Sequence, residues 1–249
     1  MKTDPVTVPG KEFEERQFRS SRFEDLYRFL PKEKALIIFD IGANIGQLSM
    51  KFREMFPAAK IHAFEPTPEA YDKLSRKFRN DGGAATNNLA VSDKTGSTSF
   101  YISDEFSKIN SVLPRNQVQR KYYKLGLDRS IVVPTITIDD YCKKNGINHI
   151  NLLKLDIQGG ELAALHGARR LLRQGQIDLI LTEALFVEIY EGAPKFFEIQ
   201  AWLDEHEYML FSLYDPHQAE DGQLVWADAI FISKALHGDH AALFKHADN

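Results

Sequence analysis

Short apolar runs alternate with amphipathic stretches along most of the chain, and this alternation predicts an α/β protein. The runs that predict strands cover residues 35–39, 60–64, 84–91, 97–102, 131–138, 149–155, 176–181, 208–214 and 224–233. The stretches that predict helices cover residues 11–30, 46–56, 68–80, 139–144, 162–173 and 195–206. Strands separated by helices favour a mostly parallel sheet with helices on both faces, closed at one edge by an antiparallel hairpin of the last two strands.

The length of 249 residues and the 43% hydrophobic content fit one domain with a single core. We place this domain at residues 35–234, after an N-terminal extension and helix (1–34) and before a polar tail (235–249). A lid-like inserted segment is expected at about 103–130, because long polar insertions in compact domains are often functional. Its six basic and three acidic residues favour an acidic or phosphate-bearing acceptor, and a solvated charged helix explains them equally well.

The overall charge and the apolar content exclude several classes of protein. A net charge of −4 argues against nucleic-acid binding, which depends on neutralising phosphates. The single cysteine, Cys142, excludes an internal disulfide and a cysteine-based zinc site. The N-terminus has no apolar signal core and no run reaches the length of a membrane span, so we expect a soluble, cytoplasmic protein.

Residues 35–46 read ALIIFDIGANIG, which predicts a buried strand, a glycine-bearing turn and the start of a helix. Gly42 and Gly46 permit a tight turn against which a ligand can lie. Asn44 is a candidate helix cap. Dinucleotide sites carry G-x-G-x-x-G, but here Asn44 replaces the middle glycine and Asp40 would repel a pyrophosphate. S-adenosylmethionine, which is cationic and has no phosphate, fits better than NAD, although a plain β-to-α turn is the alternative.

A second motif, Glu65-Pro66, ends the next predicted strand. Proline keeps the preceding residue extended, so Glu65 is expected at the strand tip. A carboxylate there can bind both ribose hydroxyls of a cofactor, in NAD and S-adenosylmethionine enzymes alike. A helix-capping role is the alternative for Glu65.

Four predicted strands end in an acid, namely Asp40, Glu65, Asp156 and Glu183. Because ligands of open α/β sheets lie outside the carboxyl ends of the strands, these acids are expected to line one crevice. Such a crevice suits a positively charged cofactor. Glu161 lies in the first turn of the following helix, where the helix dipole favours a carboxylate.

As a set, these motifs resemble those of the FkbM-type methyltransferases. The resemblance covers roughly residues 35–233 and is carried by the 40–46 turn, Phe64-Glu65-Pro66, residues 88–93 (NLAVSD) and Leu153-Lys154-Leu155-Asp156 followed by Gly159 and Glu161. One departure is Gln158, where the family usually has a glutamate.

The resemblance implies a Rossmann-like class I methyltransferase fold with a seven-stranded sheet, S-adenosylmethionine as donor, and O-methylation of sugars or natural products. It implies that Asp40, Gly42 and Gly46 line the methionine part of the cofactor and that Glu65 binds the ribose. It also implies that residues 88–91, including Asn88 and Ala90, lie near the adenine and that Asp156 sits beside the methyl group. Asn44 and Pro66, in the same motifs, are further candidate cofactor-binding residues.

Transfer to a hydroxyl benefits from a base, and Asp156 is the first candidate, followed by Glu183 and Glu161. In the alternative, Asp156 only binds the cofactor or caps its turn. No spacing demands a metal, so none is expected, although carboxylates near Asp156 and Glu183 suit Mg²⁺. Two other functions stay open: an S-adenosylmethionine-binding module without turnover, and an NAD-dependent oxidoreductase.

Overall fold

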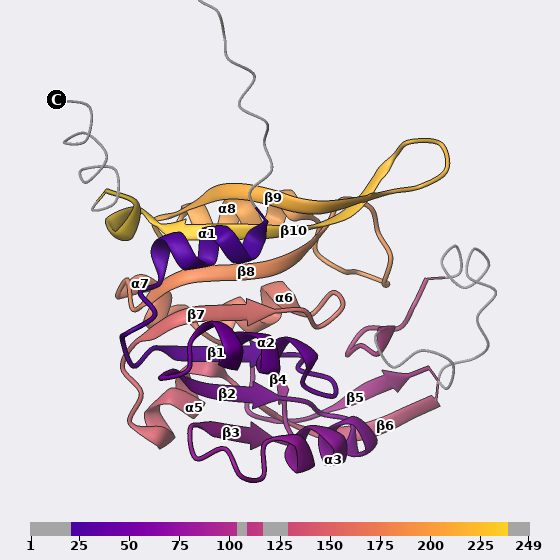
Figure 1. Ribbon diagram of the computed structural model, residues 1–249. Helices are drawn as coiled ribbons and strands as arrows, with labels where there is room; N and C mark the ends of the chain where they lie inside the picture. The colour runs from indigo at the N-terminus through magenta and orange to yellow at the C-terminus, as the bar shows by residue number, and fades with distance from the viewer. Residues whose placement is uncertain (1–20, 104–108, 117–128, 239–249) are drawn as a thin grey trace, which may run out of the picture.

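The computed structural model describes residues 21–103, 109–116 and 129–238, and its main feature is a seven-stranded sheet (Figure 1). The strand order is β3-β2-β1-β7-β8-β10-β9. All neighbouring pairs are parallel except those made by β10, which runs antiparallel to β8 and β9. This arrangement confirms the predicted fold class. The strands are β1 (Ile37–Ile41), β2 (Lys60–Phe64), β3 (Ala84–Asn87), β7 (Ile150–Leu155), β8 (Ile177–Leu185), β9 (Tyr208–Gln218) and β10 (Leu224–Ser233).

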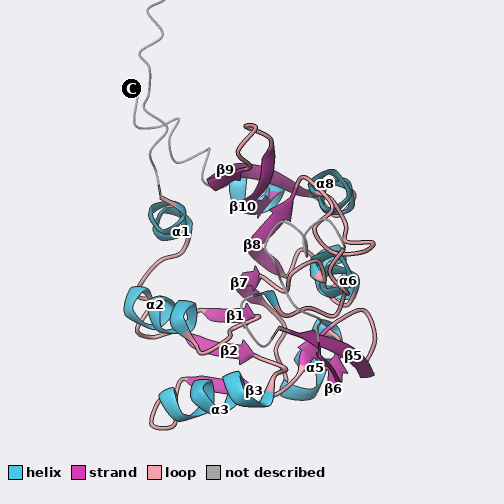
Figure 2. Cartoon of the chain, turned by 90° about the vertical axis from the view of Figure 1, so that its right-hand side faces the viewer, coloured by secondary structure: helices cyan, strands magenta, loops and turns pink. Residues whose placement is uncertain are grey.

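Helices cover both faces of the sheet, as Figure 2 shows. One face carries α1 (Arg22–Phe29), α2 (Gln47–Met55) and α3 (Pro68–Lys77); the other carries α5 (Ile138–Asn145), α6 (Glu161–His166), α7 (Arg169–Arg173) and α8 (Phe196–Asp204). Strand side chains alternate between the faces. Ile38 and Leu152 therefore pack toward α1 and α2, whereas Phe39 and Leu153 pack toward α5 to α8.

The stretch predicted as one strand over 84–91 is two strands in different sheets, and this prediction was wrong. β3 joins the main sheet, and β4 (Ala90–Val91) joins a small sheet with β6 (Arg129–Ile136) and β5 (Gly96–Ile102). The chain turns at Asn88, whose side-chain amide donates to the carbonyls of Glu65 (2.9 Å) and Pro66 (3.0 Å). These bonds draw the chain toward the end of β2.

The predicted helix over 162–173 is divided into α6 and α7. Gly167, at the end of α6, packs against the chain after β4, where a Cβ atom would lie 2.3 Å from the carbonyl oxygen of Ser92. This close approach uses the absence of a side chain.

The N-terminal helix packs on the sheet. Ser21 and Glu24 form a capping box that starts α1. The Tyr214 hydroxyl of β9 donates to Asp25 at 2.7 Å. Residues 11–20 of the predicted helix, residues 104–108 and 117–128 of the predicted insertion, and most of the polar tail lie outside the described residues. In the described part of the chain, no helix is long and apolar enough to cross a membrane.

Candidate active site

A cleft of about 650 Å³ lies where the loops after β1, β2, β3 and β7 meet. This volume is typical of small-molecule sites. Of the predicted site residues, seven line it: Gly42, Asn44, Glu65, Pro66, Ala90, Asp156 and Glu183. Four others do not line the cleft: Asp40, Gly46, Asn88 and Glu161.

Asp40 does not face the cleft, which corrects the expectation that it contacts a cofactor. β1 continues to Ile41, so Asp40 lies inside the strand and its side chain points to the α2 face. The carboxylate is fully buried, accepts a hydrogen bond from Ser49 of α2, and pairs with Lys154 at 2.9 Å. The charge of Asp40 is therefore neutralised inside the protein and does not make the crevice acidic.

Lys154 is the site residue whose role sequence reasoning missed. From β7, its buried ammonium donates to the carbonyls of Ile41 (3.2 Å) and Gly42 (2.9 Å) and lies 3.8 Å from Asp156. Burial lowers the pKa of Lys154, but Asp40 and the other nearby carboxylates outweigh it, so the pKa is raised. Lys154 therefore stays charged and ties the end of β1 to the end of β7. A lysine two positions before a strand-end acid was the available signal.

The backbone N–H groups of the turn after β1 are used within the protein. All five backbone N–H groups from Gly42 to Gly46 are paired: two with the carbonyl of Phe64, and the others with Glu65, Asn44 and Ala43. Dinucleotide sites bind pyrophosphate through N–H groups of the turn and of the first helical turn, and α2 begins only at Gln47. The pairing within the turn removes the donors that lie before the helix.

Gly42 and Gly46 are both left-handed, with φ of +78° and +81°. A Cβ on Gly42 would lie 1.9 Å from the carbonyl oxygen of Asp156, so only glycine allows the β1 and β7 loops to meet. Gly46 packs against Leu74 of α3 and supports the turn from behind. Asn44 is not the helix cap: Gly46 holds that position, and the Asn44 side chain accepts from the N–H of Ile45.

Glu65 is held in place by three hydrogen bonds. Its Oε1 accepts from the N–H and hydroxyl of Thr67, and its Oε2 accepts from the N–H of Asn44 (3.0 Å). A carboxylate has about four acceptor positions, so one remains, on Oε2. The expected two-oxygen grip on a ribose is therefore reduced to a single acceptor. Burial raises the pKa of Glu65, and the bonds from Thr67 and Asn44 oppose that rise.

Asn88 and Ala90, both expected to bind the cofactor, have different contacts. The Asn88 amide is used on the carbonyls of the β2 loop, whereas Ala90 lines the cleft beside Leu89 and Val91.

Glu161 shapes the loop after β7 and does not face the cleft, which corrects its choice as a candidate base. It is buried, and its two oxygens accept from the N–H groups of Ile157 and Gly159, each at 2.8 Å. Burial raises the pKa of Glu161 to about 7. These bonds hold a tight loop in which Gln158 and Gly159 both have positive φ.

Gln158 joins the two remaining candidate bases. Its amide nitrogen donates to Asp156 Oδ1 at 3.0 Å and to Glu183 Oε2 at 2.8 Å. Asp156 presents a half-exposed side chain to the cleft. Glu183 lies inside β8 rather than at its end, because β8 continues to Leu185. It still lies level with the end of β7, since the β7–β8 pairing ends at Leu155 and Thr182.

Burial raises the pKa of Glu183 well above its usual range, and the negative charges of Asp156 and Glu161 act in the same direction. Lys154 and the Gln158 amide lower it in part. The site therefore holds one accessible carboxylate and one with a strong affinity for a proton.

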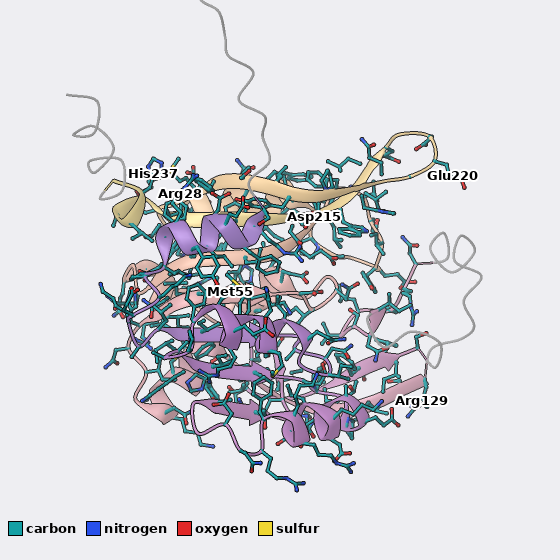
Figure 3. The ribbon with its side chains drawn as sticks, viewed as in Figure 1. Arg28, Met55, Arg129, Asp215, Glu220 and His237 are labelled. Atoms are coloured by element: carbon teal, nitrogen blue, oxygen red, sulfur yellow. The ribbon has the colours of Figure 1, made fainter. Side chains whose placement is uncertain are left out.

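A second cavity of about 370 Å³ adjoins the first and shares Asp156, Glu183 and Trp226 with it. Trp226 of β10 stacks on His217 with ring centres 5.1 Å apart. Arg22 of α1 also lines this cavity and pairs with Asp215 and Asp228, and Figure 3 shows Asp215 near the start of α1. Its polar lining is thus mainly carboxylates beside an aromatic ring.

The described middle of the predicted insertion, residues 109–116, forms a wall of the site. Ser111 exchanges two backbone hydrogen bonds with Tyr101 of β5, and its hydroxyl donates to the carbonyl of Gln158 at 2.6 Å. The carbonyl of Pro114 accepts from the N–H of Glu191, after β8. Of the basic residues of the insertion, Arg115 is buried and Arg129 lies at the outer end of β6 beside Glu69 (Figure 3).

Within the described ranges, no group of three or more His, Cys, Asp or Glu side chains is arranged to hold a metal ion.

Comparison with known proteins identifies relatives. The chain is 29% identical over 163 residues to the 2-O-methyltransferase NoeI of Sinorhizobium fredii, covering 63% of this chain and 66% of that protein. It is 25% identical to the hexuronic acid methyltransferase AglP of Haloferax volcanii (69% and 64% covered). It is 22% identical to the 31-O-demethyl-FK506 methyltransferase FkbM of Streptomyces tacrolimicus (72% and 75% covered).

The chain thus spans about two-thirds of the length of these relatives. A family model described as the methyltransferase FkbM domain matches residues 40–210, which is more than half of the chain and includes every element that borders the cleft except α1 and β10. The protein therefore belongs to the FkbM-type methyltransferase family.

Proposed function

We propose that this protein transfers a methyl group from S-adenosylmethionine to a hydroxyl oxygen of a sugar, glycan or other natural-product small molecule. The observation that carries the proposal is the linked carboxylate pair of Asp156 and Glu183 at the junction of the two cavities. Membership of the family supports methyl transfer. The names of the relatives, which include a 2-O-methyltransferase and a hexuronic acid methyltransferase, support a hydroxyl acceptor of sugar type.

The cleft fits the cofactor on two observations. The glycine turn lets a ligand approach the backbone at Gly42, and the cleft volume of about 650 Å³ is typical of a small-molecule site. We propose that Glu65 accepts a hydrogen bond from the ribose and that Ala90 lies on the adenine side. When bound, S-adenosylmethionine supplies an electrophilic methyl carbon attached to a sulfonium.

Asp156 is our first candidate for the base, with Glu183 as the second. The half-exposed carboxylate of Asp156 can accept the proton of an acceptor hydroxyl, whereas Glu183 is more deeply buried. The wall from residues 109–116 and the β10 residue Trp226 would orient the acceptor and limit access of water to the site.

The described lining favours an acceptor that is neutral at its reacting end. Asp156, Glu183, Asp215 and Asp228 would repel a carboxylate or phosphate, and Arg22 is already paired. The expectation of an acidic acceptor rests on basic residues of the insertion, most of which lie outside the described residues. A comparison of neutral hexoses with hexuronic acids as acceptors separates the two cases.

The test is binding and turnover measured separately. Calorimetry with S-adenosylhomocysteine, with NADH as a control, should show binding of the first and not of the second. Incubation with labelled S-adenosylmethionine and a panel of hydroxylated acceptors should then give labelled methyl ether. Binding without any product would favour the non-catalytic cofactor-binding module, and a folded protein that binds no S-adenosylhomocysteine would refute the proposal.

A further inference from the structure

We propose that the side-chain amide of Gln158 links Asp156 to Glu183 in place of a shared proton or a metal ion, and thereby leaves Asp156 free to act as a base. The linkage is read from the structure alone, while the role as base rests on the proposed function. Gln158 is on this view a positioning residue that acts through the two carboxylates.

The orientation of the Gln158 amide is determined by its partners. Carboxylate oxygens only accept hydrogen bonds, so the nitrogen must face Asp156 and Glu183. The amide oxygen in turn accepts from the Tyr190 hydroxyl at 2.6 Å. The backbone carbonyl of Gln158 accepts from the Ser111 hydroxyl, which restrains the residue at a φ of +58°. Two separate segments, the 109–116 wall and the chain after β8, thus hold the amide toward the two acids.

The Gln158 amide supplies hydrogen-bond donors between the carboxylates of Asp156 and Glu183. Two carboxylates that converge without a donor between them bind a proton in common or attract a cation. The charged groups that also face the pair are Lys154 on β7, Glu161 on α6, and Arg22, Asp215 and Asp228 around the second cavity. Lys154 is already engaged by Asp40 and two carbonyls. The two N–H groups of Gln158 therefore supply neutral donors at the position between the acids.

A glutamate at this position, as the resemblance would have it, would be isosteric but would carry no N–H groups. It would place a third carboxylate against the first two. The combined site would then take up a proton at neutral pH or bind a divalent cation. The presence of Gln158 thus predicts that this protein needs no divalent cation.

The first experiment follows the carboxyl ¹³C signals of Asp156 and Glu183 during a pH titration of the ligand-free protein. In Gln158→Glu, the titration midpoint of the pair should rise by roughly one pH unit or more, as for carboxylates sharing a site. Gln158→Met, which removes the donors without adding charge, should raise it less. Gln174→Glu, the same charge change at the exposed C-cap of α7, should leave it unchanged.

The second experiment is calorimetric titration with Mn²⁺. Binding by Gln158→Glu and not by the wild type or Gln174→Glu would support the proposal. Unchanged carboxyl midpoints in both Gln158 variants together with no Mn²⁺ binding would overturn it. Neither readout needs a donor or an acceptor, so their failure is distinct from the failure of S-adenosylhomocysteine binding, which would overturn the proposed function instead.

Turnover adds a readout that a merely structural residue would not change. Gln158→Glu should move the rising limb of the kcat–pH profile to higher pH, so that the loss of rate is largest at low pH and disappears as pH rises. The KM for S-adenosylmethionine should change little. A loss of kcat that is the same at every pH would instead assign Gln158 to packing alone.

Discussion

Replacing Lys154 with methionine should destabilise the protein strongly, because it would leave Asp40 as a buried charge without a cation. The two side chains are 5% and 0% exposed and their charged atoms are 2.9 Å apart. Methionine matches the unbranched stem of lysine, so packing is largely kept. The carbonyls of Ile41 and Gly42 would also lose their charged donor.

The expected loss comes from the cost of removing one partner of a buried ion pair, which is about 3–5 kcal/mol in the free energy of unfolding. For a chain of this size, each kcal/mol lowers Tm by roughly 2–4 °C, so the fall should be roughly 6–20 °C. Replacing both partners is cheaper, since a buried pair exchanged for neutral groups is often close to neutral in stability. The double variant Asp40→Asn/Lys154→Met should therefore be more stable than Lys154→Met alone.

Urea unfolding followed by circular dichroism measures this cycle at pH 7 with four proteins: wild type, both single variants and the double variant. The coupling between the two positions should be favourable and larger than 1 kcal/mol. A Lys154→Met variant that loses less than 1 kcal/mol, or a double variant no more stable than that single variant, would refute the role of Lys154 as the internal counter-ion.

Gly42→Ala should lower the free energy of unfolding by more than left-handed strain alone, which is about 1–2 kcal/mol, because the new Cβ meets the carbonyl of Asp156. Gly146→Ala, at φ +66° with open space around it, measures the strain without a clash. Equal urea midpoints for the two variants would exclude the clash. Glu161 titrates near 4.5 unfolded and about 7 folded, so the folded protein holds the proton more tightly and wild-type stability should fall as pH rises from about 4.5 to 7. Glu161→Gln should abolish this component of the slope, and urea midpoints at pH 5 and 8 that change equally in both proteins would contradict the assignment. Glu65→Gln should weaken S-adenosylhomocysteine binding by about tenfold to a hundredfold, the worth of a charged hydrogen bond, and calorimetry showing unchanged affinity would remove Glu65 from the site.

The local patterns that sequence reasoning reads well are those set by neighbours along the chain. Apolar runs and amphipathic stretches predicted the α/β layers and the C-terminal hairpin, because the periods of strands and helices are local properties. The glycine turn at Gly42 and the strand-ending Glu65-Pro66 were readable for the same reason, since each depends on the conformational freedom of one or two residues.

Such local patterns could not predict which way the acidic side chains of the strands point. One further strand residue after Asp40, and two after Glu183, moved these acids from the strand ends into the strands. In a strand, the side chain alternates between faces, so a shift of one position turned Asp40 from the expected crevice to the α2 face.

By itself, then, the sequence determined the fold class, the family and seven of the residues that line the cleft. Tertiary structure alone decided which charges stay available. Lys154 neutralises Asp40 from a strand more than a hundred residues away along the chain. Both oxygens of Glu161 accept hydrogen bonds from its own loop, and Gln158 joins Asp156 to Glu183, which lies on the neighbouring strand. The physical reason is that a charge in a protein interior acts through distance and burial, and both are set by which segments the fold brings together.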